Sequence, residues 1–149
     1  MIKQLRKLFQ LSPGERVILG QAWGLFLLAE LGLRILTFKR LLALCRKVSL
    51  TRRGPSARGG ASSVPRLAWL VEVASRYAPG ATTCLERALV LSWILGRRGV
   101  PTTLRIGVAR HDGVFSAHAW LERGGQVILG HQETERYEPL LCMTDPLRE

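Results

Sequence analysis

The sequence "TTCLERALVLSWILGRRGVP", Thr82–Pro101, contains the signals for both ends of one buried helix. Thr83 is a favourable N-cap, and Glu86 three residues later completes a capping box. Cys84 is then predicted to be the first helical residue. From residue 88 to residue 95 nearly every position is apolar, which is typical of a helix covered on all sides. Arginines, a glycine and a proline mark its end (Arg97, Arg98, Gly99 and Pro101). We therefore predict a central helix that begins with a thiol.

After this helix the hydrophobic period changes to two, which indicates strands. Residues 102–110 and 115–123 alternate between apolar and polar side chains. A turn is predicted at residues 111–113, and the glycine pair at 124–125 suits a two-residue hairpin into the strand 126–129. The sequence thus predicts a three-stranded antiparallel meander that follows the central helix.

The chain before the central helix divides into two parts. Residues 1–50 read as a basic helical region, in which Ser12–Glu15 form an N-terminal cap and the helix continues to about residue 36. Within Phe38–Val48, Cys45 falls on an apolar stripe and is expected to be a core thiol. Residues 51–63 have the composition of a flexible link. Residues 64–149 form the predicted core, starting with an amphipathic helix from Pro65 that buries one face (Leu67, Leu70, Val71, Ala74 and Tyr77).

The positive charge is concentrated at the N-terminus. The formal net charge is +11, and residues 1–60 hold twelve Lys/Arg against two acidic residues. Such a region suits an acidic partner or a membrane surface. A nucleic-acid partner is not expected, because aromatic residues are only 7% and do not interleave with the basic ones. The apolar stretch Val17–Ala29 is too short to span a bilayer, so a membrane-surface contact is the remaining membrane alternative.

Cysteine usage favours a reducing compartment. The three cysteines, Cys45, Cys84 and Cys142, are far apart in the chain and form no disulfide framework. No small-residue cleavage site follows the apolar N-terminal stretch, as a secretory signal would require. A cytoplasmic location is therefore expected.

Cys84 and His118 are the candidate catalytic residues. A thiol at a helix N-terminus faces free backbone N–H groups and the positive end of the helix dipole, both of which favour thiolate. The alternative role of Cys84 is a small apolar plug in the core. His118 lies in the middle of a predicted strand, where an adjacent central helix would bring its N-terminus. An imidazole next to a thiol takes its proton and activates it.

The residues "CLERALVLSWILGRRGVPTTLRIGV" and "FSAHAWLE" resemble the transglutaminase-like superfamily of papain-type folds, and more closely the leader peptidases of bacterial lasso-peptide biosynthesis. The resemblance implies an α+β fold with a helical N-terminal region. It implies a cysteine peptidase that removes the leader from a ribosomally made precursor peptide. Cys84 would attack the scissile carbonyl, and His118 would act as base and then as acid.

The resemblance also implies partners. A small leader-recognition protein would present the precursor, and a separate ATP-dependent cyclase would then close the macrolactam. ATP would belong to that cyclase, since this chain has no phosphate-binding loop. No cofactor is expected for the peptidase itself.

One position departs from the superfamily pattern. The third residue of such sites is an Asp about twelve residues after the His, and here that position is Gly130. Glu122 is about 13 Å along the strand from His118, too far to orient its ring. The Gly124–Gly125 turn predicts His131 opposite His118. A main-chain carbonyl, Gln132 or Glu133 would then orient the imidazole, or no group would.

Three alternatives to a peptidase follow from the same residues. A non-catalytic interaction module would explain the missing Asp. An acyl transferase or true transglutaminase would use the same nucleophile with an amine acceptor. A zinc site would use Cys84, His118 and His131, although no closely spaced ligand pair supports it. Trp120 is expected to pack beside the site, and Cys142 to be a structural residue of an extended tail.

Overall fold

The computed structural model describes residues 11–35, 40, 63–78, 80, 82–111, 113–131 and 134–144. Its helices are α2 (Pro13–Ile35), α4 (Val64–Tyr77) and α5 (Cys84–Gly96), and a short 3-10 helix, η1, spans Thr134–Arg136. Its strands are β1 (Thr103–His111), β2 (Val114–Arg123), β3 (Gln126–Leu129) and β4 (Glu138–Thr144). The architecture is α+β, as predicted. The segment Phe38–Val48 with Cys45, apart from residue 40, lies outside the described residues, as do the link up to residue 62 and the candidates Gln132 and Glu133.

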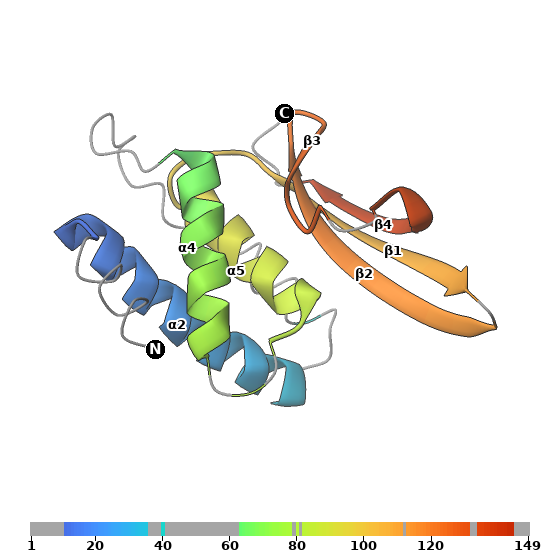
Figure 1. Ribbon diagram of the computed structural model, residues 1–149, viewed down its shortest axis with the longest axis horizontal. Coiled ribbons are helices and arrows are strands. Elements are labelled where there is room, and N and C mark those ends of the chain that lie inside the picture. The colour runs from blue at the N-terminus through green and yellow to red at the C-terminus, as the bar shows by residue number, and fades with distance from the viewer. Residues whose placement is uncertain are drawn as a thin grey trace.

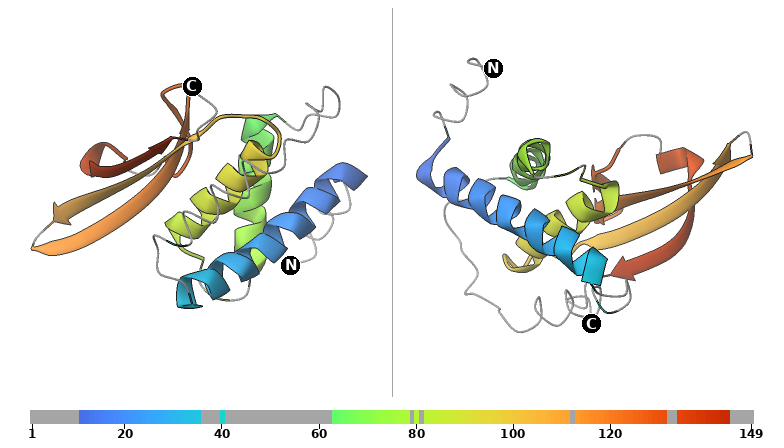
Figure 2. Two further views of the ribbon diagram at one scale, coloured as in Figure 1. Left: turned by 180° about the vertical axis from the view of Figure 1, so that it is seen from behind. Right: turned by 90° about the horizontal axis from the view of Figure 1, so that it is seen from below.

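Helices and sheet form two separate layers (Figure 1). The helices lie together on one side, and the long hairpin of β1 and β2 extends from the other side, as the views from behind and below also show (Figure 2). None of the helices in the described ranges combines the length and apolarity needed to cross a membrane.

The start of α2 is fixed by a cap and by an ion pair. The N–H of Ser12 donates to Glu15 Oε2 over 2.8 Å, and the N–H of Glu15 donates to the Ser12 hydroxyl over 3.3 Å. The other carboxylate oxygen of Glu15 accepts from Arg66 Nε on α4 over 2.7 Å. Near the far end of α4, the indole N–H of Trp23 donates to the carbonyl of Tyr77 over 2.9 Å. These contacts hold α2 against α4.

The core lies between these helices and the sheet. Apolar residues of α2 and α4 pack against α5, and α5 in turn packs on β1 and β2. Leu91 and Leu95 of α5 and Leu121 of β2 are fully buried. Four of the five apolar positions predicted for α4 are buried, whereas Tyr77 is 52% exposed.

The sheet has four antiparallel strands in the order β3-β2-β1-β4. The predicted three-stranded meander is present, but the prediction missed β4, which pairs with the far side of β1. Around Pro139 the segment carries no period-two pattern, so its strand character depends on a ladder to a partner distant in sequence. Cys142 lies on this strand and is exposed.

The predicted register between β2 and β3 was wrong by one residue. Arg123 pairs with Gln126 and Glu122 with Val127, as the glycine turn predicts, but Leu121 then pairs with Leu129. The extra residue in β3 forms a bulge, and Gly130 follows with a φ of 84°. The ladder therefore ends before reaching His131, which is exposed and does not pair with His118.

Candidate active site

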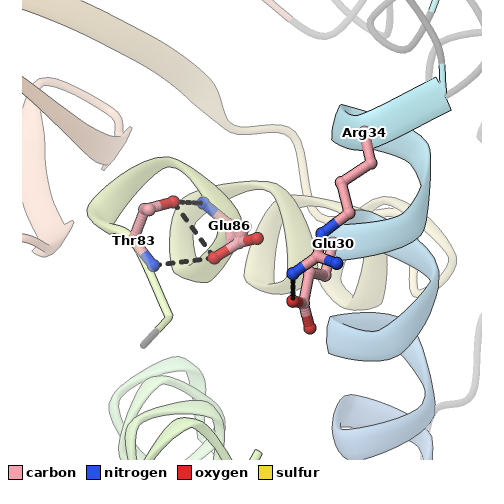
Figure 3. Close-up of polar contacts among 4 residues, drawn as sticks. All are labelled: Glu30, Arg34, Thr83 and Glu86. Atoms are coloured by element: carbon pink, nitrogen blue, oxygen red, sulfur yellow. Dashed lines mark hydrogen bonds and ion pairs between the residues drawn. The ribbon is translucent and has the colours of Figure 1, made fainter. Parts of the chain in front are cut away.

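Cys84 is the first residue of α5, as the sequence predicts, and it is half-buried. The capping box is present (Figure 3). The N–H of Thr83 donates to Glu86 Oε2 over 2.7 Å, and the N–H of Glu86 donates to Thr83 Oγ1 over 3.2 Å. Since these two bonds fix the backbone on both sides of Cys84, the thiol is held at the helix N-terminus.

The C-terminal part of α2 lies beside this cap. Figure 3 shows Glu30 and Arg34 of α2 next to the start of α5, joined by an ion pair of 2.7 Å. A Cβ added to Gly80 would lie 3.4 Å from a Glu30 carboxylate oxygen, so the loop before Cys84 runs directly past α2. The position of the thiol thus depends on α2 as well as on its own helix.

His118 is held by a main-chain acceptor. Its Nε2 lies 3.1 Å from the carbonyl oxygen of Gly130, at the sequence position where the superfamily pattern has an Asp. A carbonyl oxygen only accepts hydrogen bonds, so Nε2 carries the hydrogen in the neutral ring. Nδ1 then has the free lone pair, which is the form that a general base requires. A carbonyl was one of the orienting groups that the sequence left open.

Two aromatic rings confine the imidazole. The Trp120 ring is stacked on it at a centroid distance of 6.2 Å and an interplanar angle of 19°. The Tyr137 ring is tilted against it at 5.2 Å. Trp120 is buried and packs beside the candidate site, as expected. Tyr137 belongs to the segment just before β4, so its contact with His118 joins parts of the chain that are distant in sequence. The half-buried ring of His118 therefore has one aromatic neighbour on β2 and another on the segment before β4.

A charged pair anchors Trp120. Its indole N–H donates to Glu122 Oε1 over 2.9 Å, and Arg105 Nε of β1 donates to Glu122 Oε2 over 2.8 Å. The hydrogen bond to Glu122 raises the pKa of Arg105, so the guanidinium stays charged. Glu122 thus orients Trp120, whereas His118 is hydrogen-bonded to the Gly130 carbonyl.

Gly107 makes room for these rings. It pairs with His118 across the β1–β2 ladder. A Cβ at this position would lie 2.9 Å from Trp120 Cη2 and 2.9 Å from Tyr137 Cβ. A glycine inside a strand is a sequence signal for such a close approach.

The structure brings α5 against β2 but does not join the two candidate catalytic side chains. No hydrogen bond links the Cys84 thiol to His118 among the described residues. Because side chains alternate along β2, His118 and Trp120 share one face, while Leu121 on the other face packs into the helical core. Catalytic hydrogen bonds often tighten only when substrate binds. The catalytic pairing of Cys84 and His118 stays a prediction.

One buried donor near Cys84 has no acceptor. Within the described ranges, Nε of Arg87 is buried without a hydrogen-bond partner. Arg87 lies three residues after Cys84, so both side chains are on one side of α5. An unsatisfied buried N–H is costly, which makes this arginine a candidate for contact with a ligand.

No metal centre emerges from these side chains. In the part of the chain that the structure describes, no group of three or more His, Cys, Asp or Glu residues could hold a metal ion. Cys84, His118 and His131 therefore do not form the zinc site considered above.

The comparisons with known proteins agree with this fold. The family model of the transglutaminase-like superfamily matches residues 27–142, which include Cys84, His118 and Gly130. Because the match spans most of the 149 residues, the chain belongs to the transglutaminase-like superfamily. No curated protein and no solved structure matched the chain.

Proposed function

We propose that this chain is a cysteine peptidase, with Cys84 as nucleophile and His118 as general base and acid. The observation that carries the proposal is the hydrogen bond from His118 Nε2 to the Gly130 carbonyl, which leaves Nδ1 free to take a proton. The superfamily match and the position of Cys84 at the capped start of α5 support the same assignment.

The proposed reaction has two stages. His118 Nδ1 takes the thiol proton, and the Cys84 sulfur attacks the scissile carbonyl. The backbone N–H groups of Cys84 and Leu85 have no partner within the helix, whereas the N–H of Glu86 is taken by Thr83. Those two N–H groups would stabilise the oxyanion. His118 then protonates the leaving amine, and water hydrolyses the thioester with His118 again acting as base.

The proposed substrate is the precursor of a lasso peptide in a bacterial cytoplasm. The support is the close resemblance of the segments "CLERALVLSWILGRRGVP" and "AHAWLE" to the leader peptidases of that pathway. The chain would release the leader, and an ATP-dependent cyclase would then close the macrolactam ring.

The proposed partner is a small leader-recognition protein that docks on α2. Val17, Leu28, Leu31 and Ile35 follow one side of this helix at helical spacing and are 54–71% exposed. An apolar stripe of this kind fits a protein with an apolar groove. The helix itself holds two acidic and two basic residues, so the attraction for an acidic partner would come from the Lys and Arg residues that flank it in the chain.

The test is leader release in vitro. The purified chain would be incubated with the precursor encoded beside it and the recognition protein, and the products analysed by mass spectrometry. We expect free leader with the wild type and intact precursor with Cys84→Ala. Intact precursor with the wild type, or cleavage by Cys84→Ala, would refute the peptidase assignment.

Acyl transfer is the second candidate, because the superfamily also includes transferases and the same thioester reacts with amines. Adding a small primary amine to the cleavage reaction separates the two: a peptidase gives mainly the free acid, a transferase mainly the amide.

A non-catalytic module is the third candidate, and the missing Cys84–His118 hydrogen bond is the observation in its favour. It predicts precursor binding without any product.

A further inference from the structure

The outer half of β2 has an open edge. β2 spans Val114–Arg123, but β3 pairs only with Leu121, Glu122 and Arg123. Among the described residues no strand pairs with Val114–Trp120 on the side away from β1. This half belongs to the arm that extends away from the helices (Figures 1 and 2).

The two hairpins determine which main-chain groups face this edge. Gly124 and Gly125 both have positive φ, as in a type I′ turn, so Arg123 and Gln126 close the hairpin as a hydrogen-bonded pair. Successive residues of a strand direct their N–H and C=O groups to opposite sides. The odd-numbered residues of β2 therefore face the β3 side. The other hairpin is closed by the pair His111 and Val114. It directs the N–H and C=O groups of the even-numbered residues of β2 toward β1, which agrees with the result from the first hairpin.

Phe115 and Ala117 thus direct their N–H and C=O groups to the open edge. Phe115 is 69% exposed, and Ala117 is also exposed, so no segment within the described ranges covers these positions. His118 follows immediately and is half-buried. The unpaired N–H and C=O groups of Ala117 therefore lie directly next to the residue that carries the imidazole.

The other edges of the sheet are protected in ways that this one is not. β4 contains Pro139, and its pairing with β1 shifts between Ile106 and Gly107. β3 is only four residues long. Proline, bulges and short strands are the usual means of blocking strand addition, and Val114–Trp120 contains no proline and no bulge.

We propose that an extended segment of the substrate peptide adds to this edge as a further strand. Its main chain would bond to the N–H and C=O groups of Phe115 and Ala117, which places a peptide bond next to His118. This inference rests on the proposed function, because it assigns how the substrate is held. Main-chain bonding makes the recognition tolerant of sequence, while the Phe115 ring, with Arg110 at 5.3 Å from its centroid, offers a contact for one apolar side chain.

The variant Ala117→Pro tests the proposal by removing one edge-facing N–H. Proline is tolerated where the N–H faces away from the ladder, so the fold should persist. We expect kcat/KM for leader release to fall at least about tenfold. The variant loses one neutral main-chain hydrogen bond to the peptide, and the proline ring also obstructs the edge sterically. The matched variant Ala117→Val keeps the N–H, so its kcat/KM should exceed that of Ala117→Pro, and equal losses in the two variants would overturn the role of this N–H. Normal release by Ala117→Pro would overturn edge addition while leaving the peptidase assignment intact.

A second measurement does not depend on catalysis or on that variant. Amide hydrogen exchange would be followed by NMR in Cys84→Ala, with and without a decapeptide that spans the leader–core junction of the precursor. We expect slower exchange at Phe115 and Ala117 and unchanged exchange at Ser116 and His118. No slowing, or slowing without this alternation, overturns the proposal. The alternating pattern in a chain whose wild type releases no leader would keep edge addition and refute the peptidase.

Discussion

The imidazole Nε2 of His118 lies 3.1 Å from the main-chain oxygen of Gly130. A backbone dipole thus occupies the place that a side-chain carboxylate has in the superfamily pattern. The carbonyl selects the same ring tautomer as a carboxylate would, but it carries no full charge to stabilise the imidazolium. This substitution for the Asp is possible because the bulge in β3 and the left-handed φ of Gly130 turn the carbonyl toward the ring.

Gly130→Asp should impair the protein although it supplies the expected acid. The φ of Gly130 is 84°, and a Cβ there would lie 3.0 Å from Trp120 Cβ and 3.1 Å from the Ala119 carbonyl oxygen. We expect a loss of about 1–3 kcal/mol in unfolding free energy, measured by urea denaturation, together with slower leader release. Gly130→Ala is the control for backbone strain without a carboxylate. Faster cleavage by Gly130→Asp than by the wild type would show that the carbonyl is a poor replacement.

Gly107→Ala should displace the rings around His118. The added methyl would lie 2.9 Å from both Trp120 Cη2 and Tyr137 Cβ. Overpacking of this kind costs about 1–3 kcal/mol, and the near-UV circular dichroism of Trp120 should change. The control is Gly20→Ala in α2, where a Cβ meets nothing within 4 Å and helix propensity predicts a small gain in stability. Equal melting temperatures for the two variants would contradict the close packing at Gly107.

Glu86→Ala should weaken the start of α5. It removes the carboxylate that accepts from the N–H of Thr83. The expected loss is about 1 kcal/mol, because the part-buried N–H at the helix cap loses its acceptor. Glu86→Gln keeps an acceptor and should lose much less. Urea denaturation measures both, and the capping role of Glu86 fails if the two variants are equally stable.

Arg87→Met should keep or raise the stability of the protein and slow its leader release. Since Nε of Arg87 is buried without a partner, replacing the side chain by an apolar one of similar length should leave the melting temperature unchanged or raise it. If Arg87 contacts substrate, leader release should slow at the same time. A lower melting temperature would indicate that Arg87 has a structural partner instead.

The Glu15–Arg66 contact should make the packing of α2 on α4 sensitive to acid. The hydrogen bond from Arg66, and then that from the Ser12 N–H, lower the pKa of Glu15. A carboxyl whose pKa is lower in the folded state adds stability above its unfolded pKa, and this contribution disappears as the pH falls through the folded pKa. Glu15→Gln should therefore destabilise the protein at neutral pH and have little effect in strong acid. Thermal melts over a pH series measure this, and a pH-independent difference would exclude the linkage.

The features predicted correctly are local in the chain. Thr83 and Glu86 are three residues apart, so their capping box depends on one helical turn, and it placed Cys84 from the sequence alone. The turn at Gly124–Gly125 is equally local, and the pairing of Arg123 with Gln126 followed from it. The register failed one step later, because a bulge is decided by how the strands twist and pack.

The sequence by itself thus determined the helix that begins at Cys84, the α+β succession and the strand that bears His118, since each follows from the period of the side chains or from a cap. The tertiary structure decided what surrounds the imidazole. Three different segments supply the groups around it: Tyr137, Gly107 and the Gly130 carbonyl. Every residue has a main-chain oxygen, so the residue type at position 130 does not reveal that this one contacts His118. Only the bulge, the crossing to β4 and the close packing of rings bring these groups to His118.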